Sequence, residues 1–83
     1  MGATAKVLSV AFGRAMREER LNKGLSQEEL AFRCNLDRTY ISSVERGKVN
    51  PSVHITWLIA VALDVPLWVL IKSAEELAAN QKK

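Results

Sequence analysis

Apolar residues recur at intervals of three and four along most of this chain, the spacing that places them on one face of an α-helix. No segment shows the sustained alternation of period two that is typical of a half-buried β-strand. Signals for helix starts and stops divide the pattern into five segments. The pattern therefore predicts an all-α fold of five helices.

Local capping signals place the ends of the first two helices. Gly24 stops the first helix, because glycine readily takes the left-handed conformation that follows a helix C-terminus. Ser26 and Glu29 have the spacing of a capping box and open a second helix at about residues 27–34. We expect Asn35 to take a positive φ in the tight turn that follows.

The later helices are delimited in the same way. Asp37 caps a third helix over residues 38–46, which ends at Gly47. A fourth helix starts at Ser52, after the Asn50-Pro51 turn, and continues to residue 63. Pro66 fits the first turn of a fifth helix, which fades into residues 80–83.

Two short helices joined by about four residues predict a helix-turn-helix unit at about residues 27–46. The positions that face inward are apolar: Leu30, Ala31, Leu36, Ile41 and Val44. The positions that remain outward on the third helix are polar or amphipathic: Arg38, Thr39, Tyr40, Ser42, Ser43 and Arg46.

The first helix has one apolar face, whereas the fourth is apolar nearly all round. The face of the first helix consists of Val7, Leu8, Ala11, Phe12, Ala15 and Met16. Because the fourth helix must be covered on more than one side, we expect a homodimer formed through about residues 53–78. The candidate contacts are Trp57, Leu58, Val61, Trp68 and Ile71. The alternative is that both tryptophans belong to the core of a single chain.

The 83 residues correspond to one small domain, 1–83, and 48% hydrophobic against 25% charged residues is ordinary for a globular protein. The net charge is +3, and residues 1–50 hold nine Lys/Arg against six Asp/Glu, whereas residues 51–83 hold three of each. This basic half favours a polyanionic partner. Polar residues interrupt the apolar stretch 53–71 before it reaches the roughly 18 residues of a membrane helix.

Candidate chemistry for catalysis or cofactor binding is lacking in the sequence. It contains no Ser/His/Asp or Cys/His set, no Gly-rich phosphate loop and no metal-ligand cluster, so we expect neither an enzyme nor a cofactor. His54 has no second ligand at metal-binding spacing. Cys34 is the single cysteine, so it cannot form an intramolecular disulfide, and this favours a cytoplasmic protein. We expect its side chain to be small and buried.

Many separated positions of the chain resemble the lambda-repressor-like, Cro/CI-type regulators of the XRE family. The matching residues are Met16-Arg17, Arg20, the run 24–31 (GLSQEELA), Ile41-Ser42, the run 44–48 (VERGK), Pro51-Ser52 and the run 59–63 (IAVAL). The run 35–42 followed by residues 44–46 is most similar to the controller proteins of restriction–modification systems. The resemblance implies a third helix in the DNA major groove and a second helix whose N-terminus lies over the phosphate backbone. It also implies a structural ion pair between Arg20 and Glu45 beneath that surface.

The outward side chains suit this role. The fork of Arg38 can grip guanine O6 and N7, and Thr39 offers a hydroxyl and a methyl group, so these two and Ser43 are the predicted base contacts. The predicted phosphate contacts are Gln27, Tyr40, Ser42, Arg46 and Lys48. Three alternatives remain: Arg38 as a solvated first-turn arginine beside Asp37, Tyr40 packed on the domain surface, and Lys48 as a solvated charge only.

These features predict a sequence-specific regulator that binds a palindromic double-stranded DNA operator as a homodimer. The alternative is an antitoxin or adaptor whose main partner is another protein. RNA polymerase is a candidate further partner, and neither a membrane nor a small-molecule ligand is expected. We expect a bacterial or phage-encoded protein that is cytoplasmic and associated with the nucleoid.

Overall fold

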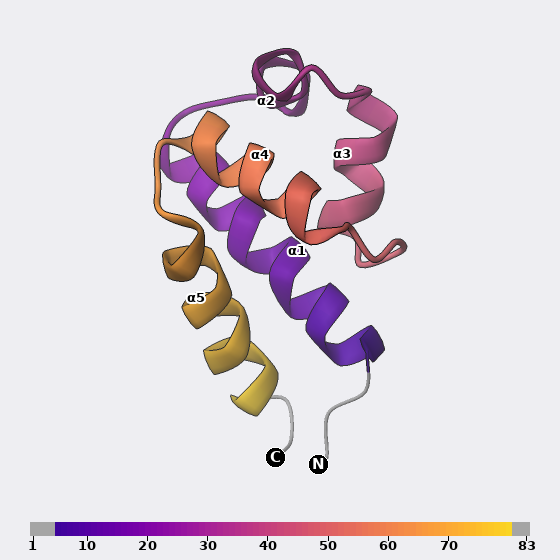
Figure 1. Ribbon diagram of the computed structural model, residues 1–83, viewed down its shortest axis with the longest axis vertical. Coiled ribbons are helices and arrows are strands. Elements are labelled where there is room, and N and C mark those ends of the chain that lie inside the picture. The colour runs from indigo at the N-terminus through magenta and orange to yellow at the C-terminus, as the bar shows by residue number, and fades with distance from the viewer. Residues whose placement is uncertain (1–4, 81–83) are drawn as a thin grey trace.

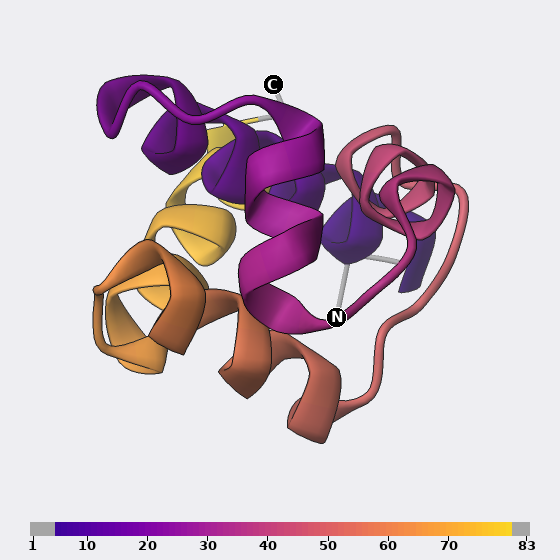
Figure 2. The same cartoon turned by 90° about the horizontal axis from the view of Figure 1, so that it is seen from above.

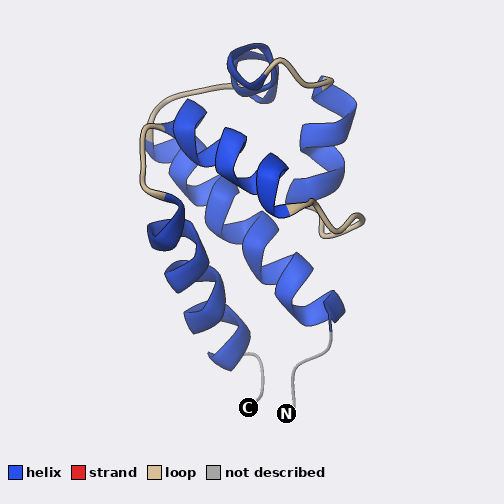
Figure 3. Ribbon diagram, viewed as in Figure 1, coloured by secondary structure: helices blue, strands red, loops and turns tan. Residues whose placement is uncertain are grey.

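The computed structural model describes residues 5–80, and all the regular structure in that range is helical (Figures 1 and 3). The elements are α1 (Ala5–Asn22), α2 (Gln27–Cys34), α3 (Arg38–Glu45), α4 (Val53–Leu63) and α5 (Leu67–Asn80). The prediction of five helices is thereby confirmed.

The capping signals around α2 act as the sequence indicates. The Glu29 backbone N–H donates to Ser26 Oγ at 3.0 Å, and the Ser26 N–H donates to Glu29 Oε1 at 2.8 Å, which completes the capping box. Asn35 ends the helix with φ 58°. This left-handed residue turns the chain from α2 into α3.

Three helix ends differ from the prediction by about one residue. α3 ends at Glu45, with Arg46 as its C-cap and Gly47 following at φ +71°. Ser52 caps α4 from outside the helix, since its Oγ accepts from the Ile55 N–H at 3.1 Å. α5 begins at Leu67, one residue after Pro66, and the Pro66 carbonyl accepts from the Val69 N–H at 3.0 Å. The predicted fading of the last helix falls mainly on residues 81–83, which lie outside the described range.

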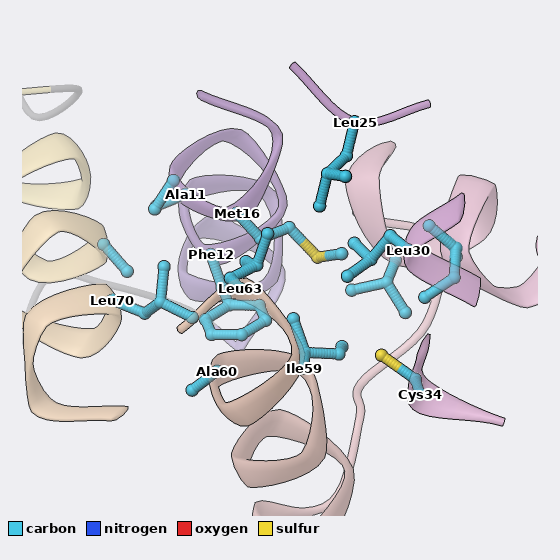
Figure 4. Close-up of a cluster of buried hydrophobic side chains, with 14 of the residues drawn as sticks. Ala11, Phe12, Met16, Leu25, Leu30, Cys34, Ile59, Ala60, Leu63 and Leu70 are labelled. Carbon is cyan, nitrogen blue, oxygen red and sulfur yellow. The ribbon is translucent and has the colours of Figure 1, made fainter. Parts of the chain in front are cut away.

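α1 is the central helix, with α5 packed along one side and α3 on another (Figures 1 and 2). α4 packs against α1, α2 and α5 and closes the core. Side chains from all five helices meet there (Figure 4). The largest fully buried ones are Met16, Leu30, Ile41, Ile59, Leu63, Leu70 and Val44. The inward positions predicted for the helix-turn-helix are buried, except that Leu36 is half-buried.

Gly13 lies where α1 and α3 approach closely. A Cβ built on this glycine would lie 2.6 Å from the Glu45 carbonyl oxygen and 2.8 Å from the Glu45 carbonyl carbon, and would also clash with the Val44 carbonyl oxygen. These are backbone atoms, which cannot rotate away as the end of a side chain can. The absence of a side chain at Gly13 therefore lets the C-terminal end of α3 lie directly on α1.

Leu8 departs from the predicted pattern. It was expected on the buried face of α1, but it is 47% exposed. It lines a groove of about 290 Å³ between α1, α4 and α5, together with Phe12, Val53 and Ile71 among others. The periodicity placed Leu8 on the correct side of α1, but none of residues 5–80 fully covers the end of that side.

α4 exposes one row of apolar side chains, and α5 exposes two more beside its start. We refer to this set as the α4–α5 apolar surface: Val53, Trp57, Val61, Trp68 and Ile71. Trp57 is 51% exposed and Trp68 is 66% exposed, so the alternative that both tryptophans belong to the core of a single chain is wrong. Leu58, also a predicted dimer contact, is half-buried within the chain.

Among residues 5–80, none of the helices is both long and apolar enough to cross a membrane by itself. α4 and α5 reach the required length and composition only when taken together, and they are bent by 108° relative to each other.

Candidate nucleic-acid interface

α3 presents a polar face to solvent while its other side is anchored in the core. Asp37 caps the helix, since its Oδ1 accepts from the Thr39 N–H at 2.9 Å. The residues that anchor α3 are Ile41, Val44 and Glu45, all buried. Of the predicted DNA contacts on or beside this helix, Arg38, Thr39, Arg46 and Lys48 are exposed, and Tyr40, Ser42 and Ser43 are half-buried.

An ion pair lies beneath this face and ties α1 to the end of α3. Arg20 Nε is 2.7 Å from Glu45 Oε2, and Arg20 Nη2 donates to Glu45 Oε1 at 3.1 Å. The two side chains are only 8% and 2% exposed, and Arg20 Nη1 also donates to the Leu25 carbonyl at 2.8 Å. The structure thus contains the pair that the family resemblance implied.

Gln27 connects this buried pair to the surface. Its Nε2 donates to Glu45 Oε1 at 3.0 Å, and its Oε1 accepts from Arg38 Nη1 at 3.3 Å. Arg38 is exposed, as in the alternative interpretation, but one of its N–H groups donates to Gln27. A polar hollow lined by Arg20, Ser26, Gln27, Glu28 and Arg38 marks this end of α3.

A second polar hollow lies at the opposite end of α3. It is lined by Lys6 and Ser9 of α1 and by residues 47–50, which include Lys48. Lys6 and Lys48 are both exposed. Sequence reasoning did not single out Lys6, since an exposed lysine near the start of an amphipathic helix carries no signal of its own.

Two of the predicted phosphate contacts have additional roles within the chain. Tyr40 is half-buried and packs against the core. Part of its side chain therefore packs on the domain, as in the alternative interpretation. Arg46 Nε donates to the carbonyl of Ser42 one turn earlier, at 3.3 Å. This hydrogen bond holds the Nε end of the Arg46 guanidinium close to α3.

Two ionisable groups of α2 are perturbed. Hydrogen bonds from the Ser26 backbone and side chain lower the pKa of the Glu29 carboxyl, which keeps the capping box charged. Burial raises the pKa of the Cys34 thiol, whose Sγ lies 3.9 Å from the Leu58 carbonyl oxygen. Cys34 therefore behaves as the small buried residue that was expected. Within the described part of the chain, no three His, Cys, Asp or Glu side chains gather as a metal site would require.

Comparison with known proteins identifies the family. The family model described as Helix-turn-helix (HTH_3) matches residues 16–67, which include α2, α3 and α4. The chain belongs to this helix-turn-helix family. The predicted resemblance to Cro/CI-type regulators is confirmed, and the chain is a DNA-binding transcriptional regulator rather than an enzyme.

Several similar proteins are restriction–modification controllers. The control protein C.BamHI from Bacillus amyloliquefaciens is 48% identical over 59 residues, which cover 70% of this chain and 73% of that protein. The crystal structure of the controller C.AhdI from Aeromonas hydrophila is 49% identical, with a TM-score of 0.72 over 74% of this chain and 92% of that one.

Two further comparisons add a longer relative and a DNA complex. A hypothetical transcription factor from Neisseria meningitidis is 48% identical over 61 residues, but this chain spans only 58% of its length. The controller C.Esp1396I, solved as a tetramer with its natural 35-base-pair operator, is 36% identical, with a TM-score of 0.78 over 88% of this chain and 95% of that one.

Proposed function

We propose that this helix-turn-helix regulator controls a restriction–modification operon in the cytoplasm. It does so by binding a palindromic double-stranded operator as a homodimer, with α3 of each copy in the major groove. The observation that carries the proposal is the anchored helix α3, whose outward face holds Arg38, Thr39 and Ser43. The similarity to C.BamHI and C.AhdI supports the assignment to restriction–modification control.

The dimensions of α3 and its surroundings fit a major groove. An α-helix with its side chains is about 10 to 12 Å across, which matches the major-groove width of about 12 Å. The hollow with Gln27 lies at one end of α3 and the hollow with Lys48 at the other. Donors at both ends can therefore bind phosphates of both strands, while the side chains between them reach base edges. We add Lys6 to the phosphate contacts predicted from the sequence.

Replacing Arg38 by alanine should weaken binding to the cognate operator by about 1 to 3 kcal/mol and relax the preference at one base position of each half-site. The reason is that a bidentate arginine–guanine contact cannot be supplied by alanine. Selection of bound sequences from random DNA, followed by binding titrations with wild-type and variant protein, measures both effects.

The matched control is Lys6→Ala, which also removes one exposed positive charge. Lys6→Ala should lower the affinity for cognate and for non-cognate DNA by the same factor. It should also reduce the salt dependence of binding, as expected for a phosphate contact. An Arg38→Ala variant with unchanged affinity for every DNA would contradict the proposal and favour an antitoxin or adaptor.

The α4–α5 apolar surface is the proposed dimer interface. Val53, Trp57 and Val61 are spaced by four residues along α4, so they form one row. Val53 and Ile71 line the same groove, which connects this row to α5. A soluble domain rarely leaves so many large apolar side chains in water, and a second copy of the chain would cover them around a two-fold axis.

Trp57→Ala should weaken the dimer by about 2 kcal/mol or more, as expected for an aromatic residue near the centre of an interface. Sedimentation over a concentration series measures this change. The control is Phe32→Ala, because Phe32 is 87% exposed on α2 and lies outside the proposed interface. Equal effects of the two variants, or a wild-type protein that stays monomeric at every concentration, would exclude this interface.

A further inference from the structure

The loop that connects α3 to α4, residues 46–52, borders two separate hollows (Figure 1). One is the apolar groove beside the α4–α5 apolar surface, the other is the polar hollow that contains Lys6 and Lys48, and Ser9 and Asn50 line both. We infer that this loop couples dimer formation to phosphate binding: the second copy that covers the groove also restrains the loop, so each event strengthens the other. This inference rests on the proposed function, from which it takes the dimer interface and the phosphate contacts.

Two contacts hold this loop on α1. Ser9 is a buried polar residue of α1, and its hydroxyl donates to Asn50 Oδ1 at the far end of the loop. At the near end, Gly47 lies so close to Val10 that an added Cβ would be 2.6 Å from Cγ2 and 2.8 Å from Cα of that valine. Lys48, a proposed phosphate contact, lies between these two contacts in the sequence. The position of its backbone therefore depends on both of them.

The apolar groove has the same loop as one of its walls. Asn50 and Pro51 belong to that wall, whereas Leu8 lines the groove from α1 and Ile71 lines it from α5. Val53 and Ile71 belong both to the groove and to the α4–α5 apolar surface, so a second copy that covers this surface also reaches the groove. An apolar side chain of that copy would pack against Pro51 and thereby limit the movement of the loop.

The coupling acts through the conformational freedom of the loop. Loops are generally more mobile than the helices that they connect, and fixing their backbone on binding costs conformational entropy. A loop that the second copy has already restrained loses less freedom when Lys48 binds a phosphate, so the dimer binds each half-site more tightly than a single chain does. Such coupling is reciprocal, and a bound half-site must strengthen the dimer by the same factor.

A short duplex with a single half-site tests the inference, because it binds one subunit and cannot bridge two. Sedimentation gives the dimer Kd with and without saturating duplex, for wild type and for Ser9→Ala. Alanine suits an α-helix but lacks the hydroxyl that holds Asn50. We expect the duplex to lower the dimer Kd of wild type about fivefold or more relative to its effect on Ser9→Ala. Repulsion between two bound duplexes is the same in both proteins, so this ratio removes it.

The possible results separate this inference from the proposed function. If the duplex changes the dimer Kd of wild type and of Ser9→Ala equally, the loop does not couple the two surfaces and the inference fails. If wild type forms no dimer, or does not bind the half-site, the proposed function fails first, and the inference fails with it. The control is Ser73→Ala, because Ser73 is a half-buried serine on α5 that lines neither hollow, and this variant should respond as wild type does.

Amide hydrogen exchange of wild type in the absence of DNA tests the inference without any variant. The Lys48 N–H donates to the Ser43 carbonyl at 2.9 Å, so its exchange reports local opening of the loop. Its protection should increase as the protein concentration is raised and the dimer forms. The reference is the Thr39 N–H, which donates to Asp37 Oδ1 at the other end of α3 and should change less. Equal changes at the two amides would overturn the inference even if Ser9→Ala folded poorly.

Discussion

Replacing Glu45 by alanine should lower the free energy of unfolding by about 3 to 5 kcal/mol, the usual cost of removing one partner of a buried ion pair. The Arg20 guanidinium would keep its hydrogen bond to the Leu25 carbonyl but would lose both oxygens of its carboxylate partner. Gln27 would lose its inner acceptor as well. Urea denaturation measures the change in the free energy of unfolding. The protein concentration must be the same for both proteins, because a dimer gains stability with concentration.

The chain offers a matched control for this experiment. Lys72 Nζ and Glu76 Oε2 form an ion pair at 2.8 Å along α5, but their side chains are 64% and 63% exposed. Glu76→Ala removes the same charge from the protein and should leave stability within measurement error, since water solvates either partner alone. Equal losses in Glu45→Ala and Glu76→Ala would show that the buried pair does not hold α1 and α3 together.

Gly13→Ala should destabilise the fold by about 3 kcal/mol, at the upper end of the usual cost of overpacking. The added methyl group would meet the carbonyls of Val44 and Glu45, so α3 would have to move away from α1. Helix propensity alone predicts the opposite sign, because alanine is the better helix former by about 1 kcal/mol. Thermal or urea unfolding therefore distinguishes the two effects by the direction of the change.

The same displacement should also reduce DNA affinity, because it moves the helix that carries Arg38 and Thr39. Arg14→Ala, at the next position of α1, is exposed and provides the control for a substitution on this helix. A Gly13→Ala protein as stable as wild type would show that the close approach of α1 and α3 can relax at little cost.

The fold was predictable from the sequence because its helix ends depend on local chemistry. Each helix end involves residues at most three positions apart: the Ser26–Glu29 capping box, the Asp37 cap and the left-handed Asn35. Such interactions between neighbours in the chain can be predicted without knowledge of the tertiary structure. Their positions fixed the register of the helix-turn-helix. The face of each helix that points inward then followed from periodicity.

The finer features of the interface depend on tertiary placement and were less predictable. The sequence suggests a phosphate contact for Gln27, but not that its amide lies between Glu45 and Arg38, 18 and 11 residues away. Lys6 approaches the hollow that contains Lys48 only because α1 passes beneath the end of α3. Gly13 lies inside a helical pattern, where glycine costs about 1 kcal/mol relative to alanine, and only the structure shows that backbone atoms of α3 fill the space beside it.

The distribution of the tryptophans has a practical consequence. The chain contains only two, and both lie on the α4–α5 apolar surface rather than in the core. In a folded single chain the two indoles are substantially in contact with water, so loss of the core would change their surroundings little. Association of two copies would transfer them to an apolar environment and shift their fluorescence to shorter wavelength. The intrinsic emission of this protein should therefore report assembly, whereas its folding has to be followed by the helical signal.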